Sequence, residues 1–93
     1  MWEIFEHRNV RGRIRQLPDE IARRYEKWKD IVEFSSAAGL RLIWGFRDES
    51  LNGQWKGHRS SRFGNEYRVM YRIERKQLYV MIVDITAHDY QRS

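Results

Sequence analysis

The stretch Tyr67-Arg68-Val69-Met70-Tyr71-Arg72-Ile73-Glu74 decides the fold, because its side chains change character at every second position. Its odd-numbered residues are aromatic or β-branched, and three of its four even-numbered residues are charged. Successive side chains of a β-strand point to opposite faces of the sheet, so a period of two is typical of a strand with one buried face. We therefore expect Arg68 to lie on the opposite face from Tyr67 and Val69.

Turn signals on both sides of this stretch predict an antiparallel meander. Gly64-Asn65 is a dipeptide typical of hairpin turns, and from Gln54 onward the preceding residues also alternate. A second turn at residues 74–77 leads into residues 78–85, which are almost continuously apolar and are predicted to lie inside the sheet. The second half of the chain is therefore expected to form three antiparallel strands.

The first half of the chain has helical periodicity instead. After a short strand at residues 2–6, apolar residues spaced by three and four predict one helix from about Asn9, an N-cap residue type, and a second after Pro18. Asp19 and Glu20 complement the positive end of the second helix dipole. The two apolar stripes are Val10, Ile14 and Leu17, followed by Ile21, Tyr25, Trp28 and Val32.

Small and polar residues connect the two halves. Residues 35–39 are expected to break the second helix, residues 40–46 are apolar, and residues 47–53 are predicted to form a polar connection that ends in a turn. The tryptophans assigned to the core are Trp2, Trp28 and Trp44.

Length and composition limit the class of protein. The 93 residues suffice for one domain, residues 1–93, of α+β class: a short N-terminal strand, a two-helix hairpin and a three-stranded antiparallel meander. The absence of cysteine excludes disulfides and thiolate metal sites and favours the cytoplasm. No stretch approaches the roughly 18 apolar residues that span a bilayer, so no membrane partner is expected.

Basic residues concentrate in the second half of the chain. The formal net charge is +5, and between Gly53 and Lys76 seven basic residues stand against two acidic ones. Such an excess suits a phosphate backbone or an acidic protein partner, and a solvated basic face without a ligand is the alternative. The seven basic residues are Lys56, Arg59, Arg62, Arg68, Arg72, Arg75 and Lys76.

Alternation predicts which of these side chains share a surface. The residues expected on one face of the strand before Gly64 are Lys56, His58, Ser60 and Arg62, and those on the other are Trp55, Arg59 and Phe63. Arg68, on the next strand, is expected beside the first group. Beyond the last strand, His88 and Tyr90 can bring an imidazole and a phenol over the end of the sheet.

A cluster of Lys, Arg, His and Tyr suits the cleavage of RNA without a metal. The RNA 2′-hydroxyl can attack the adjacent phosphate if one group removes its proton, another stabilises the phosphorane and a third protonates the departing 5′-oxygen. Arginine suits the second task, and histidine suits either proton transfer. Metal-dependent chemistry would need several convergent carboxylates, which the sequence does not offer, so no metal or cofactor is expected.

Each of these residues also has a structural alternative. Arg68 could pair with a neighbouring glutamate, Glu66 or Glu74. His88 could satisfy backbone groups at a strand end, and Tyr90 could pack the C-terminus. Other residues for which a structural or solvated role is open are His7, His58 and Trp55.

The order of elements resembles the RelE/ParE superfamily of toxins from toxin-antitoxin systems. The likeness covers nearly the whole chain and is carried by Leu51-Asn52-Gly53-Gln54-Trp55-Lys56-Gly57-His58-Arg59 and by the strand that begins at Glu66. Its Tyr-Arg-Val-x-Tyr-x-Ile pattern is shared by RNase members and by gyrase-targeting ParE members, so it indicates the fold more than the activity. The flanking segments favour the RNase branch.

The resemblance implies roles for individual residues. Arg68 matches the arginine that holds the scissile phosphate, Arg62 falls where RNase members place a basic residue, and His88 falls where they place the general acid. Lys56, His58 or Glu66 could be the general base, and Lys56 is included among the catalytic residues. The residues expected to contact RNA are His58, Arg59, Tyr90, Arg72, Arg11 and Arg15.

The resemblance also implies partners. It implies an mRNA endoribonuclease that acts without a metal, on mRNA and the ribosome, inhibits translation, and is held silent by a cognate antitoxin in a hetero-oligomer. Two alternatives stay open: a ParE-like inhibitor that binds DNA gyrase and does not need His88, and a non-catalytic RNA-binding member of the family.

Overall fold

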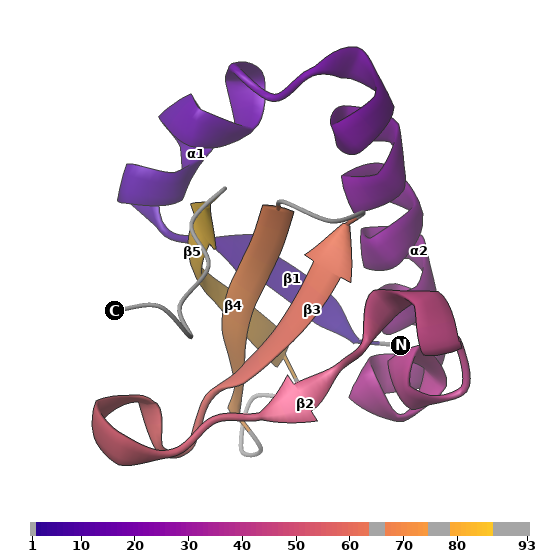
Figure 1. The fold of residues 1–93 in the computed structure, drawn as a ribbon, viewed down its shortest axis with the longest axis vertical. Helices are drawn as coiled ribbons and strands as arrows, with labels where there is room; N and C mark the ends of the chain where they lie inside the picture. Colours follow the sequence, from indigo (N-terminus) through magenta and orange to yellow (C-terminus); the bar gives the residue numbers. More distant parts are fainter. Residues whose placement is uncertain (1, 64–66, 75–78, 87–93) are drawn as a thin grey trace.

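The computed structural model of the chain describes residues 2–63, 67–74 and 79–86. Within these ranges the chain forms two α-helices, two short 3-10 helices and five strands (Figure 1). In chain order they are β1 (Glu3–Glu6), α1 (Arg8–Arg15), α2 (Asp19–Arg41), η1 (Trp44–Phe46), β2 (Glu49–Ser50), η2 (Gly53–Trp55), β3 (Arg59–Phe63), β4 (Tyr67–Glu74) and β5 (Tyr79–Thr86).

All five strands belong to one sheet, with the order β1-β5-β4-β3-β2. The antiparallel pairing of β3 with β4 and of β4 with β5 confirms the predicted meander and the α+β class. The N-terminal strand β1 joins this sheet parallel to β5, and the two residues of β2 pair with the start of β3 at the other edge. The short N-terminal strand predicted at residues 2–6 thus extends the meander at one edge. The strand β2 at the other edge was not predicted, because two residues are too few to show a period.

The two helices occur where the apolar stripes predicted them, but their ends differ. Helix α1 begins at Arg8 with His7 as its N-cap, whose Nδ1 accepts a hydrogen bond of 3.2 Å from the backbone N–H of Asn9. The prediction of Asn9 as N-cap was therefore wrong, and the cap is supplied by an imidazole nitrogen. The structural role left open for His7 is this cap.

Helix α2 continues through residues 35–39, where the sequence predicted a break. The Ser35 hydroxyl donates a hydrogen bond of 2.9 Å to the Ile31 carbonyl one turn earlier, which satisfies it inside the helix. Gly39 follows one turn later, and a Cβ there would approach the Ser35 Oγ to 1.9 Å. Because Val32 and Leu40 are both fully buried, packing on either side holds these small residues in the helix.

Residues before β3 also differ from the predicted strand. The alternation from Gln54 onward suggested a strand, but residues 53–57 form the 3-10 helix η2 and a turn in which Gly57 has a φ of 92°. Glycine adopts this left-handed conformation without a Cβ clash. Strand β3 therefore begins only at Arg59, and Lys56 and His58 lie outside it.

Aromatic side chains from α2 and the sheet form the core. Tyr25 and Trp28 of α2 are fully buried, and their rings contact Phe63 of β3 and Tyr71 of β4 at centroid distances of 5.2–6.2 Å. This places the odd-numbered residues of β4 on the face that packs on α2, as the alternation predicted. Trp2 only borders this core, and Trp44 is 79% exposed, so its assignment to the core was wrong.

Candidate functional site

Arg68 is a buried cation on the sheet face opposite the aromatic core. Only 5% of the residue is exposed, and its buried Nη2 has no hydrogen-bond partner among the residues that the structure describes. Of the two glutamates considered as partners, Glu74 pairs with Arg72 and Glu66 lies outside the described residues. A buried, unsatisfied group on a charged side chain costs more than the roughly 1–3 kcal/mol of a neutral one. An anion bound here would remove that cost.

Arg62 lies directly across from Arg68. The two are register partners in the β3–β4 ladder, so their side chains start from the same face of the sheet about 5 Å apart. Like charges at directly opposed positions destabilise a sheet. The predicted grouping of Arg62 with Arg68 on one face is thus confirmed, and their combined charge suits a phosphate.

The same face continues along β4 to Arg72. Met70 lies between the two arginines of β4 and is buried, and its register partner Ser60 on β3 is buried as well. Arg72 is exposed and its Nε donates a hydrogen bond of 2.6 Å to Oε1 of Glu74. Arg72 and Arg68 are four residues apart on one strand, or about 13 Å. Arg72 is therefore a third cation on this face, separated from Arg68 by the length of one strand segment.

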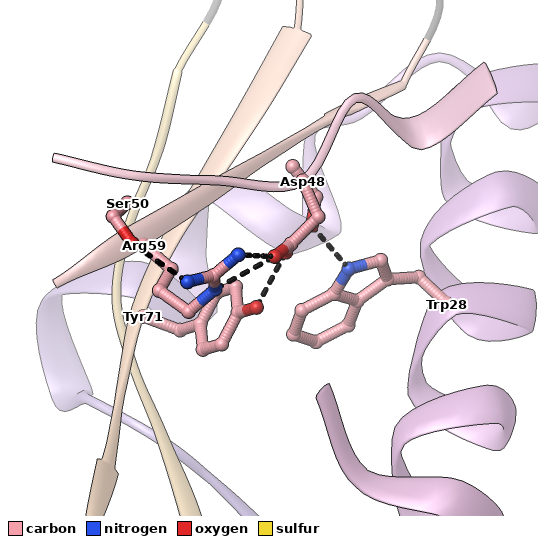
Figure 2. A network of polar contacts seen from close by, with 6 residues as sticks. Trp28, Asp48, Ser50, Arg59 and Tyr71 are labelled. Carbon is pink, nitrogen blue, oxygen red and sulfur yellow. Dashed lines mark hydrogen bonds and ion pairs between the residues drawn. The ribbon is translucent and has the colours of Figure 1, made fainter. Parts of the chain in front are cut away.

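Arg59, in contrast, lies on the core side of the sheet. Its register partner is Tyr71, and its guanidinium binds the carboxylate of Asp48, with Nε and Nη2 both 2.7 Å from Oδ1. The Asp48 side chain is fully buried, and its Oδ2 accepts hydrogen bonds from the hydroxyls of Ser61 and Tyr71 (Figure 2). The guanidinium predicted to contact RNA is therefore engaged in the fold.

The network around Asp48 connects four segments of the chain. Trp28 Nε1 donates a hydrogen bond of 2.9 Å to Ser61 Oγ, and Arg59 Nη1 donates one of 2.7 Å to Ser50 Oγ (Figure 2). Asp48 was not identified from the sequence. The burial predicted for Trp28 and Tyr71 was an available signal, because a buried indole N–H and a buried phenol each require an acceptor.

Burial and charge shift the pKa values of this network. Burial raises the pKa of the Tyr71 hydroxyl well above its ordinary value, and the Asp48 carboxylate raises it further. Burial lowers the pKa of the Arg59 guanidinium, but its hydrogen bonds to Asp48 and the charge of that carboxylate raise it overall. The Tyr71 hydroxyl therefore stays protonated and the Arg59 guanidinium charged over the whole neutral range.

Lys56 and His58 lie in the turn before β3, at the opposite end of that strand from Arg62. Lys56 is exposed. His58 is half-buried, and its ring lies nearly perpendicular to that of Trp55 at a centroid distance of 5.5 Å. Its buried Nδ1 has no hydrogen-bond partner in the described ranges. The prediction that Lys56, His58, Ser60 and Arg62 share one strand face was therefore wrong for the first two. Of these four residues, only Ser60 and Arg62 belong to β3.

The remaining predicted site residues lie elsewhere. Arg11 and Arg15 are exposed and one turn apart on α1. His88 and Tyr90, predicted as general acid and nucleotide contact, lie outside the described residues. In the described ranges, no three His, Cys, Asp or Glu side chains are grouped so that they could hold a metal ion, and no helix has the length and apolar character needed to cross a bilayer.

Neither protein-family models nor curated proteins give a match to this sequence, whereas solved structures do. RelE from the RelE-RelB complex of Pyrococcus horikoshii OT3 is similar over 96% of this chain and 97% of that one, with a TM-score of 0.74 and 22% identity. The YoeB/ParE toxin from Agrobacterium tumefaciens gives a TM-score of 0.76 at 14% identity, over 94% of this chain and 99% of that one.

A third similar structure comes from the RelBE2 toxin-antitoxin complex of Mycobacterium tuberculosis. The TM-score is 0.68 at 20% identity, and the match covers 94% of this chain and 98% of that one. The chain therefore has the fold of RelE, YoeB and ParE-type toxins, as the sequence resemblance predicted.

Proposed function

We propose that this protein is the toxin of a toxin-antitoxin pair and cleaves mRNA as an endoribonuclease that needs no metal, acts on ribosome-bound message and thereby inhibits translation. The main support is that Arg62 and Arg68 lie directly opposite each other in the sheet. Arg68 is buried, and its Nη2 has no partner within the described residues. The fold shared with RelE and YoeB supports the same assignment. The cytoplasm is the compartment in which such a toxin would meet its substrate.

The proposed reaction is an attack within the RNA strand. The 2′-oxygen forms a bond to the adjacent phosphorus while the bond from phosphorus to the 5′-oxygen breaks, which leaves a 2′,3′-cyclic phosphate and a free 5′-hydroxyl. Arg68 and Arg62 would donate hydrogen bonds to the non-bridging oxygens, whose charge grows in the phosphorane.

Two proton transfers complete the reaction. We assign protonation of the departing 5′-oxygen to His88, and removal of the 2′-hydroxyl proton to Lys56, His58 or Glu66. Histidine suits such a transfer because its ordinary pKa lies near neutral pH. Arg72 and Tyr90 would contact the flanking RNA.

The proposed partners are a cognate antitoxin and the ribosome. Two of the similar structures are complexes of RelE-type toxins with their RelB-type antitoxins, and this supports a protein that covers the arginine face and forms a hetero-oligomer with the chain. Arg11 and Arg15 project from α1 into solvent and suit contact with ribosomal RNA.

The test is to induce the protein in cells and map the ends of mRNA. Wild-type protein should produce new 5′ ends within coding sequences. Arg68→Met and His88→Ala should each lower cleavage by about 10²-fold or more, the typical effect of removing one charge-stabilising or proton-transferring group. Arg23→Met is the matched control, because Arg23 is an exposed arginine of α2 and should leave cleavage unchanged.

Two results would contradict the proposal. Intact transcripts together with arrested replication would indicate inhibition of gyrase by binding. Cleavage by purified protein on intact ribosomes that is lost in EDTA and restored by magnesium would contradict the metal-free reaction.

A further inference from the structure

A basic hollow adjoins the Arg62–Arg68 pair on the side of α2. It has a volume of about 300 Å³, the lower end of the range for small-ligand sites. Besides Arg62, its lining comes from α2 and from residues 43–46, which include the 3-10 helix η1. The lining residues are Arg24, Lys27, Ile43, Gly45, Phe46 and Arg62.

Arg62 belongs to both the hollow and the phosphate site because it lies at an open edge of the sheet. β2 pairs only with Arg59 and Ser60, so the outer side of β3 has no neighbouring strand at Arg62. The Arg62 side chain can therefore start from the face that carries Arg68 and still line the hollow beside α2. A ligand in the hollow would lie one side chain away from the proposed scissile phosphate.

The lining of the hollow combines three cations with an apolar wall, and none of its described lining residues is a carboxylate. Lys27 and Arg62 form no ion pair within the described part of the chain, and Arg24 has only an exposed contact of 3.4 Å with Glu20. Phe46 is buried and Ile43 is partly exposed, so together they offer a firm apolar surface. Cations beside an apolar surface suit a nucleotide, which has a charged phosphate and a flat base.

We propose that this hollow binds the RNA nucleotide that adjoins the scissile phosphate, with Lys27 and Arg24 on its phosphate and Ile43 and Phe46 against its base or ribose. The proposal rests on the proposed function, because it places the RNA strand across Arg62. An acidic protein segment is the alternative occupant of the hollow, because it is negatively charged like RNA. RNA is favoured because the hollow shares Arg62 with the phosphate site.

Binding of an uncleavable RNA tests the hollow separately from the reaction. The probe is a fluorescent single-stranded oligonucleotide with 2′-O-methyl riboses, titrated with purified protein at several salt concentrations. Lys27→Gln should raise Kd severalfold and lower the slope of log Kd against log salt by about 0.7, the value for one lost phosphate contact on a single strand. Arg23→Gln removes the same charge from α2 outside the hollow and is the matched control.

A second variant blocks the hollow without removing a charge. A Cβ added at Gly45 meets no atom within 4 Å, so Gly45→Leu should fill the hollow and leave the fold intact. It should weaken RNA binding as Lys27→Gln does. In cleavage assays on ribosomes, both variants should raise KM and leave kcat near the wild-type value, whereas Arg68→Met should lower kcat.

The outcomes separate this inference from the proposed function. If the wild-type protein cleaves mRNA but Lys27→Gln and Gly45→Leu bind RNA no worse than Arg23→Gln, the hollow is not an RNA site and the RNase assignment stands. If RNA binding depends on Lys27 but no cleavage occurs, the RNase assignment fails and the hollow stands. If the two variants weaken binding of an acidic antitoxin peptide and not of RNA, the inference is overturned.

Discussion

Arg59 and Arg68 lie on neighbouring strands of one sheet and are both largely buried, yet their surroundings are opposite. The Arg59 side chain is 17% exposed and binds the buried carboxylate of Asp48, within a network that reaches Ser61 and Tyr71. Arg68 is 5% exposed, and its buried Nη2 has no hydrogen-bond partner among the described residues. One face of the sheet therefore has an arginine that is bound to a carboxylate of the fold, and the other has the arginine that we propose to bind a phosphate.

Replacing each arginine by methionine should show this contrast most strongly, as opposite changes in the free energy of unfolding. Arg59→Met leaves the Asp48 carboxylate buried without a counterion, so the free energy of unfolding should fall by about 3 kcal/mol. Arg68→Met removes a buried charge whose Nη2 has no partner among the described residues, so the free energy of unfolding should rise by about 1 kcal/mol or more. Urea unfolding of the two variants measures both values. Equal losses would show that Arg68 is also part of the fold.

After Arg59, the Tyr71 hydroxyl is expected to contribute most of the stability that the Asp48 network provides. Tyr71→Phe removes its hydrogen bond to the carboxylate and should lower the free energy of unfolding by about 2 kcal/mol, as expected for a bond to a charged group. Tyr67→Phe is the matched control, because Tyr67 lies on the same face of β4 and is only half-buried. A loss below 0.5 kcal/mol in Tyr71→Phe, on the order of noise in such measurements, would contradict this role.

Alkaline pH should weaken the core side of the sheet. Burial raises the pKa values of Tyr25 and Tyr71, which are further raised by Glu6 and Asp48 respectively, so above about pH 10 the unfolded chain loses protons that the folded chain keeps. Stability present below the unfolded pKa is then lost as the pH rises, by about 1.4 kcal/mol per pH unit for each tyrosine. Urea unfolding between pH 9 and 11, about the unfolded tyrosine pKa, measures the slope, which should be smaller in Tyr71→Phe.

Arg72 tests whether an ion pair stabilises this fold when it is exposed to solvent. Arg72 pairs with Glu74 at 2.6 Å, but both side chains are partly exposed. Arg72→Gln should therefore change the free energy of unfolding by no more than about 0.5 kcal/mol, as is usual for solvent-screened pairs. Thermal unfolding of this variant beside Arg59→Met measures the difference. A loss as large as that of Arg59→Met would mean that ion pairing matters here regardless of solvent exposure.

The sequence predicted the parts of the fold that have a clear period. The alternation of β4 placed Val69 and Arg68 on opposite faces, and the spacing of Tyr25, Trp28 and Val32 identified the buried side of α2. The ends of elements were less predictable. Ser35 and Gly39 have low helix propensity, and only their packing shows that α2 continues to Arg41.

The candidate site was predictable only where strand geometry determined it. The register of two strands brings Arg62 opposite Arg68, but alternation beyond the strand wrongly placed Lys56 and His58 beside them. Lys27 of α2, Gly45 of η1 and Arg62 of β3 line one hollow because of tertiary packing, which no local pattern predicts. Asp48 could not be identified because its partners come from two other elements, β3 and β4, which tertiary packing brings to it.

The parallel pairing of β1 with β5 has a consequence for the time at which the protein becomes complete. β1 is made before the other elements of this fold, but its neighbour β5 is made only after β2, β3 and β4. A contact so distant along the chain forms slowly, because a long loop must close first. A nascent chain that has not yet released β5 therefore lacks the neighbour of both β1 and β4, and its arginine face is unfinished. A protein proposed to attack ribosomes would in this way remain harmless to the ribosome that is making it.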